Sequence, residues 1–287
     1  MVYMLTALIT GTSTGIGRST ALRLARDGIR VWASMRDVSQ GVSLEQISTE
    51  EKLDLQTIQL DVEDETSVNK AFQQIGNVDI LINNAGISPV GSVEEFDISA
   101  WKNLFDINVF GLIRCTQAAL PGMRANQFGR IINISSVAGR VAIPMFGPYS
   151  STKWSVEAIS ESLATESAIF GIYVTLIEPG AVATPIREKT GSPDRSSPYR
   201  PVAKNWGFSV GYDHANPSEP EDVADAILKT IHDLHPPLRV TVGRGVKQMV
   251  KLREQHDDRE WVDLWSADTN NFLSRWEKLT GDDLTTP

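Results

Sequence analysis

The stretch Thr10-Gly11-Thr12-Ser13-Thr14-Gly15-Ile16-Gly17 follows a short apolar run and leads directly into a helical pattern. Glycines in such a turn let the chain reverse sharply and let backbone amides approach a pyrophosphate, and the helix N-terminus adds partial positive charge. The spacing is Gly-x3-Gly-x-Gly, which differs from the Gly-x-Gly-x-x-Gly of the standard dinucleotide fingerprint. Because the loop follows the first apolar run, we predict a dinucleotide-binding turn. Its candidate contacts are Gly11, Ser13, Thr14, Gly15, Ile16 and Gly17.

Outward from this turn, short apolar runs alternate with segments of helical period, as expected of parallel strands joined by crossover helices. The predicted strands are residues 5–10, 30–34, 57–60, 78–82, 130–135, 173–177 and 238–242. The predicted helices are residues 17–27, 66–74, 99–126, 150–170 and 219–233. This order predicts an α/β fold, a doubly wound Rossmann-type parallel sheet of seven strands with helices on both faces. A (β/α)₈ barrel competes, but the chain is one strand short of it.

The composition of the 287 residues is ordinary for a globular protein, with 41% hydrophobic and 22% charged residues. The formal net charge of −9 argues against a nucleic-acid partner, which needs clustered cations. Cys115 is the only cysteine, so no intrachain disulfide is possible and a reducing, cytoplasmic location is favoured. No stretch reaches the roughly 18 apolar residues that a membrane helix requires. We expect one domain over residues 1–287, with a core at 1–243.

Two segments interrupt the α/β alternation. Residues 185–220 contain six prolines and scattered aromatic residues, a pattern too irregular for a long helix. We interpret them as a loop that covers the substrate, with a disordered surface excursion as the alternative. Residues 244–287 carry five large apolar side chains near helical spacing, which are Trp261, Leu264, Trp265, Phe272 and Trp276. We predict an amphipathic helical extension that packs on the body or on a neighbouring subunit.

The end of the second strand carries the signal for cofactor choice. Met35 occupies the strand tip and Arg36 follows it. A guanidinium there suits a 2′-phosphate, whereas an acidic residue would accept from a free 2′-hydroxyl. We therefore favour NADP(H) over NAD(H), although Asp37 next to Arg36 keeps NAD(H) open.

A second constellation follows the fifth predicted strand. Tyr149 and Lys153 stand four residues apart and so share one helix face, and Ser136 lies thirteen residues before the tyrosine. A phenol with an ordinary pKa near 10 exchanges protons poorly at neutral pH, and a neighbouring ammonium stabilises its phenolate. A serine hydroxyl at the strand tip would hold a carbonyl or alcohol oxygen in place. The alternative is a surface Tyr-Lys pair with a capping serine.

Together these residues resemble the short-chain dehydrogenase/reductase family, in its single-domain subgroup, from about residue 5 to residue 242. Residues 10–17 look like the cofactor loop of that family, and Asn83-Asn84-Ala85-Gly86 looks like the stretch that braces the adenine side. The resemblance implies catalytic roles for Asn108, Ser136, Tyr149 and Lys153. It further implies cofactor contacts at Asp61, Val62, Tyr149, Lys153, Pro179, Gly180, Val182 and Thr184.

The resemblance also implies the mechanism. Hydride passes between nicotinamide C4 and the carbonyl carbon, while Tyr149 exchanges the proton and Ser136 orients the oxygen. Lys153 binds the ribose and lowers the pKa of Tyr149, and Asn108 holds a relay water. We therefore predict an NADP(H)-dependent oxidoreductase acting on a carbonyl or alcohol.

Several alternatives stay open at this point. They are an NAD-linked secondary-alcohol dehydrogenase, a non-catalytic dinucleotide sensor and an isomerase or dehydratase acting on a nucleotide sugar. The apolar residues of 88–90, 144–146 and 185–220 indicate a hydrophobic, medium-sized substrate such as a cyclic or aryl ketone or a steroid-like alcohol. The resemblance implies a homodimer or homotetramer formed through residues 99–126 and 150–170. The four histidines lack neighbouring ligands at metal spacing, so we predict no metal site.

Overall fold

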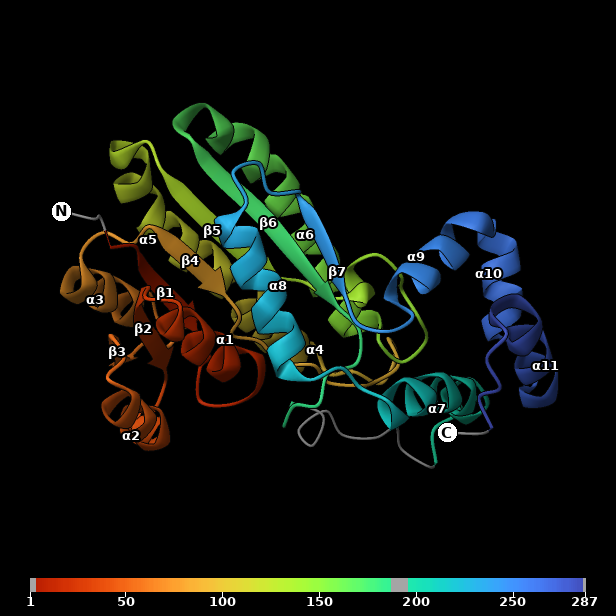
Figure 1. Ribbon diagram of the computed structural model, residues 1–287. Helices are drawn as coiled ribbons and strands as arrows, with labels where there is room; N and C mark the ends of the chain where they lie inside the picture. The colour runs from red at the N-terminus through yellow and green to blue at the C-terminus, as the bar shows by residue number, and fades with distance from the viewer. Residues whose placement is uncertain (1–3, 187–195, 286–287) are drawn as a thin grey trace.

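The computed structural model describes residues 4–186 and 196–285, and its centre is a seven-stranded parallel sheet (Figure 1). The strand order is β3-β2-β1-β4-β5-β6-β7, which confirms the predicted doubly wound class and excludes a barrel. The strands are β1 (Thr6–Thr10), β2 (Arg30–Met35), β3 (Leu55–Gln59), β4 (Ile80–Asn83), β5 (Gly129–Ile134), β6 (Ile172–Pro179) and β7 (Arg239–Val242).

Helices cover both faces of this sheet. The α-helices are α1 (Gly15–Arg26), α2 (Val42–Glu51), α3 (Glu65–Ile75), α4 (Ile98–Phe105), α5 (Gly111–Asn126), α6 (Gly147–Ser167), α7 (Arg200–Ala215), α8 (Pro220–His232), α9 (Val246–Gln255), α10 (Asp258–Trp265) and α11 (Thr269–Thr280). Short 3₁₀ turns lie at η1 (Val38–Gly41), η3 (Val137–Gly139) and η4 (Ala168–Phe170), and a π-helical turn lies at η2 (Asp106–Phe110).

Successive side chains along each strand point to opposite faces of the sheet, so the core has two layers, one on each face. In β1, Ala7 and Ile9 pack toward α1 and α8, whereas Leu8 between them packs toward α3 and α5. All three side chains are fully buried. Strands buried on both faces need apolar residues at every position, so the unbroken apolar runs predicted a parallel sheet correctly.

The position of the site follows from the strand order. β1 pairs with β2 on one side and with β4 on the other, so the chain changes its winding direction between β1 and β4. Ligands of open α/β sheets bind outside the carboxyl ends of the strands at such a switch point. Thr10 ends β1 and Asn83 ends β4, so the glycine turn that follows Thr10 lies at this position.

The prediction for residues 185–220 was wrong in one respect, because residues 200–215 form the regular helix α7. Pro201 stands in its first turn, where its fixed φ is tolerated. Asn205 and Ser209, four residues apart, are buried on one face of α7. Packing against the C-terminal helices therefore stabilises a helix that the local sequence pattern did not predict.

Two further helical differences concern the first half of the chain. Helix α2 was not predicted, because only Leu44 and Ser48 of its ten residues are buried and the segment has almost no apolar period. The predicted helix 99–126 is instead α4, η2 and α5 in succession, with the π-helical turn at its centre. Such single-turn π interruptions are frequent at functional sites.

The C-terminal segment forms three helices rather than one. They gather beside α7, to one side of the sheet (Figure 1). Phe272, Trp265 and Trp276 pack on one another with ring centroids 5.2 to 5.5 Å apart. Val141, from the segment between η3 and α6, belongs to the same apolar cluster. The extension therefore packs on the body of its own chain, and no described helix is long and apolar enough to cross a membrane.

Candidate active site

The glycine turn is packed too closely for side chains at its glycines. Gly11 has φ +72°, and an added Cβ would lie 2.9 Å from the Ala85 Cα. Gly15 has φ +57°, and an added Cβ would lie 3.0 Å from the Thr184 Cγ2. Both residues need glycine because other residues rarely adopt this backbone conformation. The turn thus brings residues 11–15, 85 and 184 together, and its bare backbone leaves room for a phosphate group.

Asn84 ties the turn to the end of β4. Its Nδ2 donates to the carbonyl oxygens of Thr10 at 2.8 Å and Gly11 at 2.9 Å. An added Cβ on Gly17 would lie 2.5 Å from the same Nδ2, so the start of α1 approaches Asn84 closely. Ala85 donates its amide to the Thr10 Oγ1 at 3.0 Å. These bonds hold the loop and residues 84–86 as one unit.

The remaining predicted residues of the turn lie at the start of α1. Thr14 is the N-cap residue of α1 and is exposed, while Ser13 and Ile16 are half-buried. The side chain of Thr14 makes no capping hydrogen bond. The first amides of α1 lack intrahelical partners, as in every helix, and these are the groups that bind anions.

Arg36 lies at the end of β2, as predicted, but it already has an acidic partner. Its Nη1 is 3.4 Å from the Glu63 Oε2, and its side chain is 70% exposed. Burial, followed by the neighbouring Asp61 carboxylate, raises the pKa of Glu63. Asp61 accepts a hydrogen bond from the Glu63 amide, and Val62 packs against Gly111 of α5.

The segment after β6 closes the other side of the glycine turn. Gly180 donates its amide to the Val242 carbonyl oxygen at 3.0 Å and is packed against Val246. Val182 is buried and forms a bridge with Ser218. Thr184 therefore reaches Gly15, and Pro179 ends β6. The backbone of the glycine turn thus lies between two fixed segments, residues 84–86 and residues 179–184. The residues present at this position suit a bound dinucleotide.

Tyr149 and Ser136 meet at the carboxyl end of β5. Tyr149 lies in the first turn of α6, and Ser136 caps the turn η3 by accepting the Ala138 amide at 3.1 Å. Burial raises the pKa of the Tyr149 phenol to about 12, and a hydrogen bond with the Ser136 side chain acts in the opposite direction. The serine therefore both caps a turn and contacts the phenol.

Lys153 stands one helical turn further along α6 and is buried. Its Nζ donates to the Ile134 carbonyl oxygen at 2.7 Å and lies 5.7 Å from the centre of the Tyr149 ring. Burial lowers the pKa of Lys153 to about 8, and the negative charge of Glu157 opposes that shift. In the protein alone the ammonium thus does not bring the pKa of Tyr149 below its ordinary value.

Asn108 lies in the π-helical turn η2 and is buried. Its Nδ2 donates to the Ile87 carbonyl oxygen at 2.9 Å and to the Thr152 Oγ1 at 3.1 Å. Its Oδ1 accepts the Ile87 amide at 2.9 Å. The side-chain amide thus links Ile87 to α6.

Two neighbours complete this centre, and sequence reasoning anticipated only the aromatic one, within residues 144–146 and 185–220. The Phe146 ring lies 5.7 Å from the Tyr149 ring and 5.5 Å from the Trp206 ring, which it meets edge to face. Helix α7 thus places the Trp206 ring against Phe146, whose ring lies next to Tyr149. The second neighbour is Glu157, which shares a helix face with Lys153, and its spacing of four residues was the available signal.

No group of three or more His, Cys, Asp or Glu side chains within residues 4–186 and 196–285 is arranged to hold a metal ion. His232 instead contacts Asp27 at 2.7 Å, and His235 contacts the Tyr173 hydroxyl at 3.2 Å. Cys115 is buried, and burial raises its pKa to about 12, so this thiol is inert.

The fold and the site define an α/β oxidoreductase that works with a nicotinamide dinucleotide. Comparison with known proteins specifies the class further, because the short chain dehydrogenase family matches residues 5–195. The chain belongs to this family, and it is an oxidoreductase acting on CH–OH groups with NAD(P).

Three similar proteins illustrate the relationship. Retinol dehydrogenase 8 of Bos taurus is 33% identical over 96% of this chain and 92% of its own length. The 17-beta-hydroxysteroid dehydrogenase type 1 of Mus musculus is 36% identical over 86% of this chain and 76% of its own length. The crystal structure of a short-chain dehydrogenase from Streptomyces avermitilis is 30% identical, covers 98% of both chains and superposes with a TM-score of 0.79.

Proposed function

We propose that this protein interconverts a carbonyl and an alcohol on a hydrophobic, medium-sized substrate, with NADP(H) as cofactor and Tyr149 as general acid or base. The observation that carries the proposal is the placement of the buried Lys153 one helical turn from Tyr149, with its Nζ 5.7 Å from the centre of the Tyr149 ring. This centre lies at the same edge of the sheet as the glycine turn.

In the proposed reaction the nicotinamide supplies or accepts the hydride. Ser136 orients the carbonyl oxygen, and Tyr149 donates a proton to it. A phenol with a pKa of about 12 is neutral at physiological pH and so carries the proton, and positive charge beside it is needed to make that proton easier to donate. Lys153 holds positive charge beside the ring and stabilises the phenolate left after transfer. Asn108 acts by fixing residues 86–87 against α6.

Replacing Tyr149 with Phe tests the proposal. The change removes the proton donor and keeps the ring, so turnover of a ketone panel should fall about 10²- to 10⁴-fold. NADPH binding and the unfolding temperature should stay close to wild type. Tyr173→Phe is the matched control, because Tyr173 lies at the amino end of β6 and its hydroxyl contacts His235. Full ketone turnover by Tyr149→Phe would refute the assignment.

The preference for NADP(H) rests on Arg36 at the tip of β2. A guanidinium binds a phosphate bidentately, and the side chain is largely exposed at the expected position. The NAD-linked alternative remains the direct competitor, since Glu63 already neutralises part of this charge. Parallel titrations with NADPH and NADH separate the two.

The proposed hydrophobic substrate rests on the surfaces next to Tyr149. Phe146 and Trp206 form an aromatic wall beside it. Ala142 and Pro144, from the segment that leads to Phe146, line a hollow of about 260 Å³ together with Trp261 and Trp265. The two relatives named above carry retinol and hydroxysteroid in their names, which fits a flat hydrophobic alcohol or ketone.

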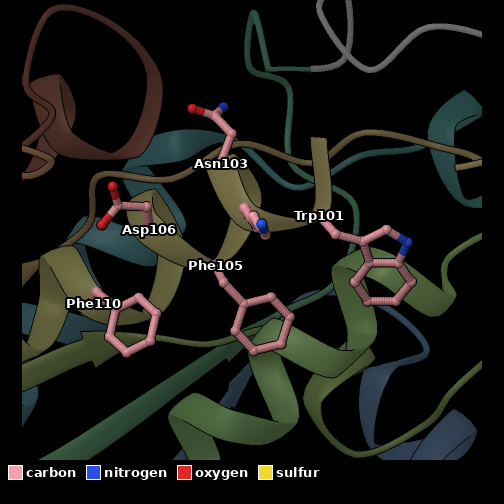
Figure 2. Close-up of a pocket in the computed structure, with 6 residues that line it drawn as sticks. Trp101, Asn103, Phe105, Asp106 and Phe110 are labelled. Carbon is pink, nitrogen blue, oxygen red and sulfur yellow. The ribbon is translucent and has the colours of Figure 1, made fainter. Parts of the chain in front are cut away.

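We further propose a cytoplasmic homo-oligomer assembled through α4, α5 and α6. Phe110 and Trp154 are each 51% exposed on this side. A hollow of about 620 Å³, lined by α4 and η2, lies between Trp101 and Phe110 (Figure 2). None of its lining residues belongs to the proposed catalytic set, so we assign it to subunit contact rather than to substrate. Light scattering measures the mass of the assembly.

A further inference from the structure

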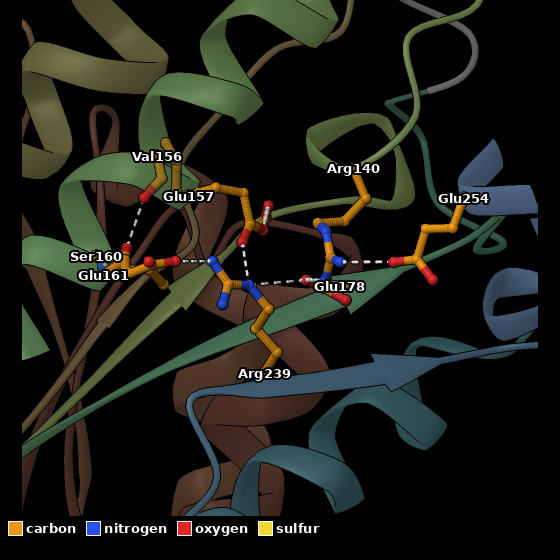
Figure 3. Close-up of polar contacts among 10 residues, drawn as sticks. Arg140, Val156, Glu157, Ser160, Glu161, Glu178, Arg239 and Glu254 are labelled. Atoms are coloured by element: carbon orange, nitrogen blue, oxygen red, sulfur yellow. Dashed lines mark hydrogen bonds and ion pairs between the residues drawn. The ribbon is translucent and has the colours of Figure 1, made fainter. Parts of the chain in front are cut away.

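Glu157 is a buried carboxylate immediately behind the proposed catalytic centre. It lies on α6, and its side chain is only 7% exposed. Its Oε1 accepts the Ser135 hydroxyl at 2.5 Å, and its Oε2 accepts the Arg239 Nε at 2.8 Å (Figure 3). Both carboxylate oxygens are therefore bonded to fixed partners, which keeps the carboxylate in one orientation.

A buried carboxylate is costly unless it is paired and hydrogen-bonded, as Glu157 is. Glu157 and Lys153 are four residues apart on one helix face. Lys153 is itself buried, and its one described hydrogen bond goes to an uncharged carbonyl oxygen of Ile134. The negative charge of Glu157 is the one group that raises the pKa of Lys153 against the effect of burial.

A second carboxylate nearby behaves differently. Glu178, at the end of β6, is fully buried, and burial together with the charge of Glu157 raises its pKa. Arg140 contacts it at 3.3 Å and Arg239 at 3.6 Å (Figure 3). Within the described residues its Oε2 has no hydrogen-bond partner. Because Glu157 has two close hydrogen-bond donors, hydrogen bonds stabilise its negative charge better than that of Glu178.

The contacts of Glu157 also reach the strand end that carries Ser136. Ser135 precedes Ser136, and its hydroxyl is the one bonded to Glu157. An added Cβ on Gly139 would lie 2.7 Å from the Ser135 Oγ and 3.1 Å from the Glu157 Cγ. The turn η3, α6 and the end of β5 are thus packed together around this carboxylate.

We propose that Glu157 is a positioning residue for the active site, which keeps the Lys153 ammonium charged and, through Ser135, holds the end of β5 that presents Ser136. Arg239 fixes the Glu157 carboxylate and moderates its charge. The inference rests on the proposed function for its catalytic consequence, but the effect on Lys153 is a property of the protein alone.

The charged and titratable groups around Lys153 and its neighbour Glu157 come from several elements. On α6 they are Tyr149 and Glu157, with the exposed Glu161 one turn beyond. β6 contributes Glu178, and β7 contributes Arg239. Arg140 follows η3 and pairs with Glu254 of α9. η2 presents Asn108, which is uncharged.

The titration of Lys153 tests the proposal directly. In cofactor-free protein labelled with ¹³C at lysine Cε, the Lys153 signal is assigned by its loss in Lys153→Arg and followed against pH. Glu157→Gln keeps the shape and removes the charge, so the midpoint should fall by about one pH unit. Arg239→Gln removes the opposing cation and should move the midpoint upward. A purely structural role predicts no such opposite shifts.

Glu161→Gln is the matched control, because Glu161 contacts the same Arg239 at 2.6 Å but is 61% exposed. Its Lys153 midpoint should match wild type. In turnover, Glu157→Gln should lose activity at lower pH than wild type and recover toward it as the pH falls, since Lys153 is protonated again. An unchanged midpoint in a folded Glu157→Gln variant, or equal shifts in both variants, would overturn the inference. Absence of turnover in wild type would instead refute the proposed function and leave the titration valid.

Discussion

At the scale of single residues, chemistry here depends on what each charge already contacts. Arg36 is paired with Glu63, Glu157 is paired with Arg239, and Lys153 donates to the Ile134 carbonyl oxygen. The position of a charged residue in the sequence therefore indicates what it could bind, and its ion-pair or hydrogen-bond partner determines how strongly it binds. For Arg36 this means that a 2′-phosphate has to compete with the Glu63 carboxylate.

Arg36→Ala should weaken NADPH binding about 10-fold or more while leaving NADH binding unchanged, since a charged hydrogen bond contributes roughly 1.5 to 3 kcal/mol. Glu63→Gln should tighten NADPH binding, because it frees the guanidinium. Fluorescence titration with both cofactors measures the effects. Arg26→Ala is the control, as Arg26 is also exposed and ion-paired, with Glu51 at 2.6 Å. Equal weakening of both cofactors by Arg36→Ala would contradict the assignment.

At the scale of elements, α7 and the π-helical turn η2 both shape the candidate site. η2 interrupts a long helix where Asn108 bonds Ile87 and Thr152. α7 carries Trp206 to the edge of the Phe146 ring, next to Tyr149. A crossover segment between β6 and β7 has thereby become part of the aromatic surface beside Tyr149.

Trp206→Ala should lower kcat/KM for an aryl or polycyclic ketone about 10-fold, because loss of one hydrophobic contact surface costs roughly 1 to 3 kcal/mol. The value for a short aliphatic aldehyde should change less, since that substrate does not extend to Trp206. Steady-state kinetics on both substrates gives the ratio. Lys204→Ala, an exposed position on the same helix, should behave as wild type. Parallel loss for both substrates would assign Trp206 to folding rather than to specificity.

At the scale of the whole molecule, the C-terminal helices are joined to the active-site segment. Val141 packs in the same cluster as Trp265, Phe272 and Trp276. The Trp261 Nε1 donates to the Ala142 carbonyl oxygen at 3.2 Å. The Tyr212 hydroxyl of α7 donates to Asp282 at 2.9 Å, near the C-terminus. The C-terminal helices α9, α10 and α11 therefore pack onto the segment that leads to Tyr149.

Phe272→Ala should destabilise the protein by about 3 to 5 kcal/mol, because the side chain is fully buried among aromatic rings. Urea unfolding followed by tryptophan fluorescence and by circular dichroism measures the change. Val262→Ala is the control, since Val262 is 54% exposed on α10 and such positions change stability by about 0.5 kcal/mol or less. A separate early transition in wild type would show that the C-terminal helices unfold independently of the sheet.

The sequence by itself determined the sheet, the glycine turn and the identity of the catalytic candidates. These features depend on local rules: apolar runs make buried strands, glycines permit φ near +72° at Gly11, and a spacing of four places Tyr149 and Lys153 on one face. The tertiary structure decided the rest. It made a helix of residues 200–215, divided the helix around Asn108 and paired Arg36 with Glu63. It also raised the pKa of Tyr149 to about 12. Burial and contacts between distant segments set each of these outcomes, and neither is encoded in any local stretch of the chain.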